Sequence, residues 1–270
     1  MEKTLSQGFH GKLSNQAGFG QTIQQSLTMA YRGILKIRRT PEQLLDVTLA
    51  PILFTLMFTY LFGGAISGNV HNYLPIIIPG ILAQSVLTGS VAIGVQLCED
   101  MSKGVFDRFR SLPIARIAPL AGALLADTIR YALVTILTFT MGFIMGFRPT
   151  AGITGVLEAS LLVIVFGWCI SWVFAFLGVI SRTASSVQGI SMMVMFPLTF
   201  LSNAFVPVNT LPSALKWFAT VNPVSHLINA VRQLVMQGSI GHDFWLTLLG
   251  AVVIVLIFAP LTVRFYMRKA

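Results

Sequence analysis

Six long apolar stretches run along the chain, separated by short polar segments. A bilayer core of ~30 Å takes about 20 apolar helical residues to cross, and each stretch is long enough. The pattern therefore predicts an all-α polytopic membrane protein with six transmembrane helices, in a single transmembrane domain over residues 1–270. The predicted spans are residues 44–66, 74–97, 117–147, 153–180, 186–206 and 244–265.

Composition favours a membrane protein over a soluble helical bundle. Hydrophobic residues make up 55% of the chain, charged residues 10%, and the mean hydropathy is +0.79. A soluble domain carries roughly a quarter charged residues, and its helices rarely stay apolar all round for so long. The first 40 residues are polar, which argues against a cleaved signal peptide.

Basic residues lie mostly on one side of the predicted spans, and that side is assigned to the cytoplasm by the positive-inside rule. They are Lys3, Lys12, Arg32, Lys36, Arg38, Arg39, Lys103, Arg108, Arg110, Arg116, Arg182, Arg264, Arg268 and Lys269, against Arg148, Lys216 and Arg232 opposite. This predicts a multi-pass protein of the cell (plasma or inner) membrane with both termini cytoplasmic. The net charge of +9 is dispersed along loops, which favours membrane lipids over nucleic acid as partners.

The cytoplasmic N-terminus, residues 1–41, contains a helical pattern that is too polar to span. Ile23, Leu27, Ala30, Tyr31 and Ile34 recur at steps of three and four residues. This spacing predicts an interfacial helix over residues 20–39, lying along the inner leaflet. A soluble leader helix without a partner is the alternative.

The most charged segment, residues 99–116, follows the second predicted span. It mixes acidic and basic residues with an apolar row at nearly helical spacing, and Pro113 ends it. An amphipathic helix of mixed charge on the cytoplasmic side is suited to docking a soluble partner. A solvated turn would need fewer residues and no apolar row.

The third non-spanning segment, residues 207–237, precedes the last predicted span. Pro212 opens a short helix, Asn222 and Pro223 interrupt it, and a second amphipathic helix runs on to Gly238. Two short apolar helices predict a re-entrant hairpin on the outer side, which must be buried in protein or line a wet cavity. We expect this hairpin to close the outer mouth of a pathway, with Pro207, Pro212, Asn222 and Pro223 as outer-gate residues.

Charged residues inside the spans are few. Asp127 and Arg130 lie three residues apart in the third stretch, so they can pair on one helical face. Intramembrane charge points to function by default, but a structural pair is the favoured interpretation here. Gly142 and Gly146 form a G-x-x-x-G motif, interpreted as close helix packing.

Catalytic and metal-binding patterns were sought and not found. Cys98 and Cys169 fall in spans, the four histidines lack ligand spacing, and no G-x-x-x-x-G-K-[ST] phosphate loop occurs. We therefore expect no catalytic residue, metal or cofactor on this chain.

Two stretches carry a family resemblance: FDRFRSLPIAR (Phe106–Arg116), and Phe200–Leu234 with its P-V-x-x-L-P and N-P-V motifs. On these residues the chain resembles the membrane (permease) subunits of bacterial ABC exporters of the daunorubicin-resistance class, over nearly its whole length. The resemblance implies the type V exporter fold, with residues 99–116 as a cytoplasmic coupling helix. It also implies pairing with a second, identical or related permease, and two copies of a separate ATP-binding subunit that hold ATP and Mg²⁺.

By the same resemblance, polar residues of the coupling helix and N-terminal helix, most of them charged, contact the ATP-binding subunit. These are Glu99, Asp100, Lys103, Asp107, Arg108, Arg110, Tyr31, Arg32 and Lys36. The second and fifth spans are implied to line the pathway, and each carries a polar row. The pathway candidates are Gln84, Thr88, Gln188, Met192, Met195, Phe196, Thr199, Phe200 and Asn203. Ordinary packing through small and hydroxyl residues explains the rows equally well.

The expected function is ATP-driven export of a hydrophobic or amphipathic cargo: a drug, lipid, lipid-linked polymer or peptide. An ion-gradient-driven secondary transporter is the alternative, but it would want paired carboxylates or a histidine at mid-membrane. An intramembrane serine protease would need a Ser and a His facing each other. His226 is the only histidine near such depth, and Ser225 beside it points elsewhere on a helix.

Overall fold

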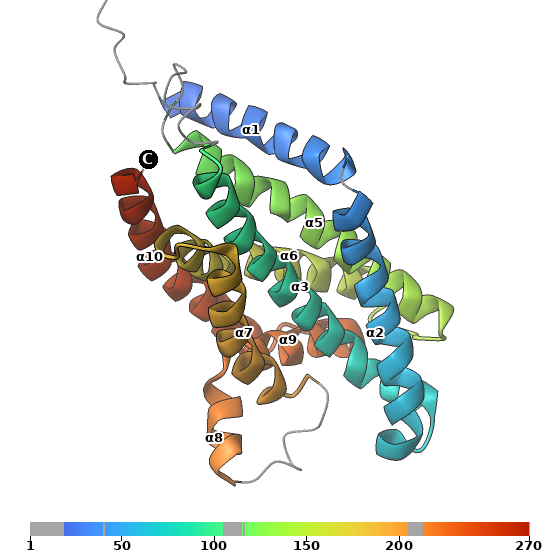
Figure 1. Cartoon of the computed structure of the whole chain (residues 1–270). Coiled ribbons are helices and arrows are strands. Elements are labelled where there is room, and N and C mark those ends of the chain that lie inside the picture. The colour runs from blue at the N-terminus through green and yellow to red at the C-terminus, as the bar shows by residue number, and fades with distance from the viewer. Residues whose placement is uncertain (1–18, 40, 105–114, 116, 205–212, 270) are drawn as a thin grey trace, which may run out of the picture.

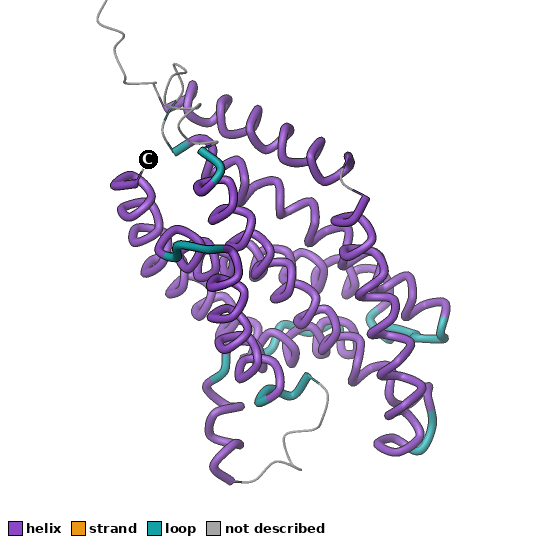
Figure 2. Tube along the Cα trace, viewed as in Figure 1, coloured by secondary structure: helices purple, strands orange, loops and turns teal. Residues whose placement is uncertain are grey.

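The computed structural model describes residues 19–39, 41–104, 115, 117–204 and 213–269, and this part of the chain is a bundle of helices (Figure 1; Figure 2). The helices in chain order are α1 (Phe19–Arg39), α2 (Pro41–Ser67), α3 (Val70–Ser102), α5 (Ala118–Ile144), α6 (Gly152–Ile180), α7 (Ala184–Phe200), α8 (Ser213–Val221), α9 (Pro223–Gln237) and α10 (His242–Lys269). No strand occurs in these described ranges.

Five helices are long and apolar enough to cross a bilayer. They are α3, α5, α6 and α10 over their full lengths, and α2 from Thr48 to Ser67. These match five of the six predicted spans, with ends that differ by a few residues. The fifth predicted span, residues 186–206, corresponds to α7, which is a shorter apolar helix of 17 residues. The coarse prediction of an all-helical polytopic membrane protein is therefore confirmed.

Helix α3 lies at the centre of the bundle and packs against α2, α5, α6, α7 and α9. Its closest crossing is with α6, where Gly94 faces Gly178. A Cβ atom added at Gly178 would collide with the backbone of Gly94, and one added at Gly94 would collide with the Phe174 carbonyl. Small residues permit such backbone contact between membrane helices.

A buried hydroxyl group joins three of the spanning helices. The Ser90 hydroxyl of α3 donates to the Val86 carbonyl of its own helix at 2.8 Å, with the Gly167 carbonyl of α6 as a longer second acceptor at 3.4 Å. It also lies 3.0 Å from the Tyr131 hydroxyl of α5. Buried polar groups are stable only when hydrogen-bonded. The contact therefore fixes α5 and α6 against the central helix at one level.

Helices α6 and α10 run parallel. Thr262 of α10 donates to the Trp172 carbonyl at 3.3 Å, and Lys269, seven residues on, donates to the Val179 carbonyl at 2.6 Å. The ends of both helices therefore lie together. The chain between them, which contains α7, α8 and α9, must return from one end of the bundle to the other.

Prolines stand inside four of the long or apolar helices: Pro51 in α2, Pro75 and Pro79 in α3, Pro197 in α7, and Pro260 in α10. Each removes a backbone N–H and weakens its turn of helix. Membrane helices tolerate this when neighbouring groups bond the freed backbone. Helices α5 and α6 have no proline beyond their first turn.

Two sequence interpretations need correction. Gly146 does not belong to a packing motif inside a helix, because α5 ends at Ile144 and Gly146 adopts φ 97° just after it. Gly142 does pack closely, against Ile78 of α3. The predicted coupling segment 99–116 also does not begin as a separate helix, because Glu99 and Asp100 continue the last turn of α3.

Candidate functional site

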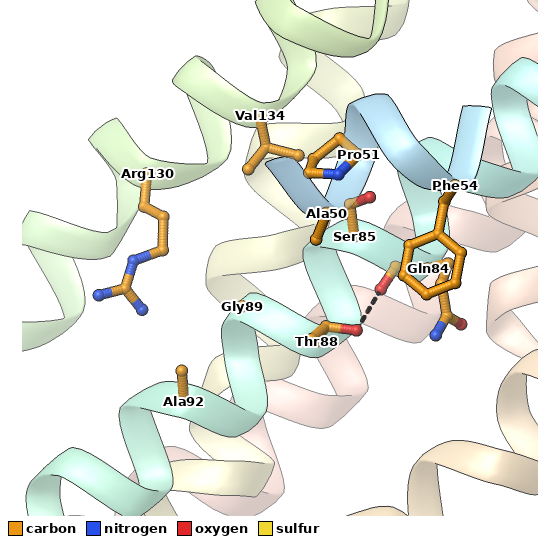
Figure 3. Close-up of a pocket in the computed structure, with 10 residues that line it drawn as sticks. All are labelled: Ala50, Pro51, Phe54, Gln84, Ser85, Thr88, Gly89, Ala92, Arg130 and Val134. Carbon is orange, nitrogen blue, oxygen red and sulfur yellow. Dashed lines mark hydrogen bonds between the residues drawn. The ribbon is translucent and has the colours of Figure 1, made fainter. Parts of the chain in front are cut away.

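A cleft lies between α2, α3 and α5, and it collects the polar row of the second predicted span (Figure 3). Gln84, Ser85 and Thr88 of α3 supply its polar wall, and Pro51 and Phe54 of α2 form an apolar wall. The four-residue spacing puts Gln84, Thr88 and Ala92 on one helical face. The structure therefore brings these three together in the lining of the cleft.

The hydrogen bonds of the cleft are incomplete. The Thr88 hydroxyl donates to the Gln84 carbonyl at 3.0 Å and lies 3.8 Å from the Met195 sulfur of α7. The side-chain oxygen Oε1 of Gln84 is buried and has no hydrogen-bond partner. Such an atom is costly in a membrane interior, so it marks a position for a ligand or water.

The predicted ion pair forms: Arg130 Nη1 lies 3.3 Å from Asp127 Oδ1, and each side chain is only 5% exposed. The sequence does not predict which other helices surround this pair. Arg130 also lines the cleft, and its side chain extends from α5 toward Gly89 and Ala92 (Figure 3). The helical spacing that predicted the pair carries no information about its neighbours in space.

The predicted row on α7 is divided between two faces. Met195, Thr199 and Asn203 are buried, Met192 is half-buried, and Gln188 is exposed. Phe196 and Phe200 are half exposed, at 51% and 53%, with ring centroids 5.5 Å apart. The inward residues pack within this chain, and the exposed members of the row are Gln188, Phe196 and Phe200.

The two short helices predicted before the last span are present as α8 and α9, with the break and the end at the expected residues. Asn222 caps α9, because its Oδ1 accepts from the Val224 N–H at 2.9 Å. Its Nδ2 donates to the Leu198 carbonyl of α7 at 2.8 Å. Pro223 occupies the first turn, and Gly238 ends α9 at φ 63°. Pro207 and Pro212 lie outside the described residues.

Helix α9 is anchored by polar contacts that the sequence did not reveal. Arg232 Nη2 donates to the Ile76 carbonyl of α3 at 3.3 Å, beside the turn that Pro79 weakens. Asn229 accepts from the Asn203 side chain, and His226 Nδ1 lies 2.6 Å from Asp243 Oδ1 of α10. His226 thus pairs with a carboxylate, which accounts for its presence without a serine protease.

Asn222→Ala should loosen the hairpin. The change removes the cap of α9 and the link to α7, and each buried hydrogen bond contributes about 1 kcal/mol. We expect a loss of ~2 kcal/mol in unfolding free energy and faster amide exchange in α9, measured by hydrogen exchange in nanodiscs. Thr220→Ala, at an exposed hydroxyl of α8, is the matched control. Equal exchange in both variants would contradict the anchoring role.

Of the candidate partner-contact residues, Glu99, Asp100 and Lys103 lie at the end of α3, and Tyr31 and Arg32 lie on α1. Lys103 and Glu99 form an exposed ion pair at 2.8 Å, and Tyr31 of α1 is 63% exposed. Arg32 is also exposed. Lys36 belongs to α1 but its side chain lies outside the described part, as do Asp107, Arg108 and Arg110.

Helix α1 packs on α5 through one part of its predicted apolar row. Ala30 is buried, whereas Ile23, Leu27 and Tyr31 are exposed. A Cβ added at Gly33 would come within 2.7 Å of Ala126 Cβ, and Gly122 of α5 packs equally closely against α1. The predicted apolar face therefore divides into a row against α5 and an exposed row.

These features define a polytopic helical membrane protein whose polar residues converge on a cleft and on the helix ends. The chain matches the family described as ABC-2 type transporter over residues 24–236, and it belongs to that family.

Named relatives agree. The chain is 43% identical over 248 residues to a daunorubicin resistance ABC transporter permease protein of Streptomyces coeruleorubidus, covering 92% of this chain and 87% of that protein. It is 25% identical over 219 residues to a probable doxorubicin resistance ABC transporter permease protein of Mycobacterium tuberculosis, covering 81% and 79%. It is 22% identical over 202 residues to an O-antigen export system permease protein of Klebsiella pneumoniae, covering 72% and 73%. The predicted family is thereby confirmed, and the chain is a membrane permease.

Proposed function

We propose that this chain is the permease subunit of an ATP-driven exporter, and that a separate ATP-binding subunit supplies the energy. The observation that carries the proposal is the family match together with the 43% identical resistance permease. ATP and Mg²⁺ would bind the partner subunit and not this chain. Relatives named for drug resistance favour an amphipathic drug as cargo, and the O-antigen relative keeps a lipid-linked polymer open.

In this proposal α7 also crosses the bilayer, as the fifth of six crossings. Because α6 and α10 are parallel, the chain between them has to return across the bundle. Seventeen residues of helix rise about 26 Å, close to the ~30 Å of a bilayer core. With six crossings both termini lie on one side, which the basic residues assign to the cytoplasm.

The proposed assembly holds two permeases, identical or related, and two ATP-binding subunits. Residues 99–116, with Tyr31, Arg32 and Lys36 of α1, would contact the ATP-binding subunit. Closure of those subunits around ATP would tilt the two permeases between inward-open and outward-open states. The hairpin with Pro207, Pro212, Asn222 and Pro223 would close the outer mouth.

The proposed pathway runs between the two permeases, along α3 and α7. The exposed side of α7, with Gln188, Phe196 and Phe200, would face a second copy or the cargo. The buried Thr199 and Asn203 would shape that surface from behind. Variants that test transport therefore belong at Phe196 and Phe200, because bulky residues at Thr199 would disturb packing within the chain.

The function is tested by co-purifying the chain with an ATP-binding subunit and measuring ATP hydrolysis in nanodiscs. We expect a stable complex, and a further stimulation of hydrolysis by an anthracycline drug. The charge reversal Asp107→Arg with Arg108→Asp should lower stimulated hydrolysis about tenfold, because it inverts charges at the proposed contact.

Arg148→Glu, on an exposed arginine at the other end of the bundle, is the control for that reversal. A folded permease that binds no ATP-binding subunit would overturn the exporter proposal and favour the gradient-driven alternative. If the charge-reversal variant keeps normal stimulated ATP hydrolysis, only the proposed contact role of residues 99–116 is overturned.

A further inference from the structure

The guanidinium of Arg130 is the most unusual group in the cleft. It is 5% exposed within a membrane bundle and meets a single oxygen of Asp127 at 3.3 Å. A guanidinium carries five N–H donors, and the Nε donor has no hydrogen-bond partner. Buried donors without acceptors are costly. The geometry therefore favours an additional oxygen-rich group beside Arg130.

Gly89 of α3 and Arg130 of α5 line the cleft together. A Cβ at Gly89 would come within 3.1 Å of the Tyr131 ring and 3.8 Å of Arg130 Cδ, so the missing side chain lets the two helices approach closely here. The unpartnered oxygen of Gln84 lines the same cleft, nearer Phe54 (Figure 3). A ligand with an anionic oxygen and a hydroxyl could therefore accept from Arg130 and donate to Gln84.

The helices that border the cleft also expose apolar side chains. On α2, Leu53 is 59% and Phe54 39% exposed. On α5, Ile129 is 50% and Leu133 36% exposed, and each precedes a residue of the cleft. Apolar surface of this kind on a spanning helix faces lipid chains. The ligand of the cleft would thus have its polar end among Arg130 and Gln84 and its apolar part against the bilayer.

We propose that the cleft between α2, α3 and α5 binds the phosphate of an acidic phospholipid, whose acyl chains lie on the exposed residues of α2 and α5. Arginine suits this role because its planar fork binds phosphate through two parallel hydrogen bonds. The glycerol hydroxyls of a phosphatidylglycerol headgroup match the free oxygen of Gln84. The proposal goes beyond the exporter function, because this binding requires neither ATP nor a partner subunit.

The test is lipid retention by the full chain, purified in detergent with equal amounts of phosphatidylglycerol and phosphatidylcholine and weighed by native mass spectrometry. We expect the wild type to retain phosphatidylglycerol about tenfold over phosphatidylcholine, as charge-assisted hydrogen bonds imply. Asp127→Asn should raise this preference, because it removes the carboxylate that competes for Arg130. The double variant Asp127→Asn with Arg130→Gln should abolish it.

These opposite effects separate a lipid site from a structural pair. A purely structural pair gives no lipid preference in the wild type and no increase in Asp127→Asn, and either result overturns the proposal. Gln84→Leu keeps the volume and should lower the preference severalfold. Arg148→Gln, which removes an arginine outside the cleft, must leave the preference unchanged. Gel filtration of each variant shows that it is folded.

Two further measurements distinguish a lipid from free phosphate as the ligand, and the cleft proposal from the exporter proposal. Excess inorganic phosphate should not displace phosphatidylglycerol, and full displacement would show a site for the free anion and overturn the lipid assignment. Complex formation with the ATP-binding subunit is measured on the same samples. Loss of the lipid preference with an intact complex would overturn the cleft proposal only. A retained lipid preference without complex formation would overturn the exporter proposal only.

Discussion

Replacing Gly178 with alanine is expected to destabilise the bundle by about 3 kcal/mol, the upper end of overpacking effects. The added methyl group would collide with the backbone of Gly94 at the crossing of α3 and α6. A backbone atom cannot turn aside as a flexible side chain can, so the two helices must separate. Because α3 is central, this displacement reaches the helices that pack on it.

The measurement is thermal or steric-trap unfolding in detergent, together with the yield of monodisperse protein. Gly64→Ala is the matched control, because nothing lies within 4 Å of a Cβ at that position of α2. That control should be neutral or stabilising by under about 1 kcal/mol, the helix-propensity difference between the two residues. Similar stability of both variants would show that α3 and α6 are not as close as described.

Arg130→Gln is expected to cost about 3–5 kcal/mol, the usual loss when one partner of a buried ion pair is removed. The change leaves the Asp127 carboxylate buried, and its Oδ2 already has no hydrogen-bond partner. Asp127→Asn should cost less, because the Arg130 side chain lines the cleft, where water or the proposed lipid phosphate would solvate its charge. We therefore expect the free energy of unfolding to fall more when Arg130 is replaced than when Asp127 is replaced.

A double-mutant cycle measures this asymmetry. Asp127→Asn with Arg130→Gln removes both charges and keeps both shapes, so it should recover most of the stability that Arg130→Gln alone loses. Unfolding free energies of the four proteins in the same detergent give the coupling. Additive losses would mean that the two side chains do not form the pair shown by the structure.

The sequence predicts the spanning helices well because each helix that crosses the bilayer must be apolar along its whole crossing. Runs of about 20 apolar residues located α2, α3, α5, α6 and α10 to within a few residues. The ends of α8 and α9 are also predictable, since an Asn-Pro break and a terminal glycine have local causes. The apolar runs and the helix-ending residues are both local patterns in the sequence, and neither depends on tertiary contacts.

The sequence predicts less well which face of a helix turns inward. The spacing predicts a single surface for the row on α1 and for the row on α7, but each row contains both buried and exposed residues. On α1, Ala30 is buried and the helix packs on α5, and on α7, Thr199 is buried in the bundle. When nearly all residues are apolar, hydropathy no longer distinguishes a buried face from one that faces lipid. The cleft around Arg130 needs three helices to meet, which no local pattern can show.

The prolines divide the spanning helices into two mechanical groups. Helices α5 and α6 lack internal prolines, so no turn in them has lost a hydrogen bond to a ring nitrogen, and they form a stiff frame joined through Ser90 of α3. Helices α2, α3, α7 and α10 each contain a weakened turn that bends at low energy. Bending at these hinges would change the width of the α2–α3–α5 cleft while the frame keeps its shape. The locations of five prolines thus determine where this bundle can flex.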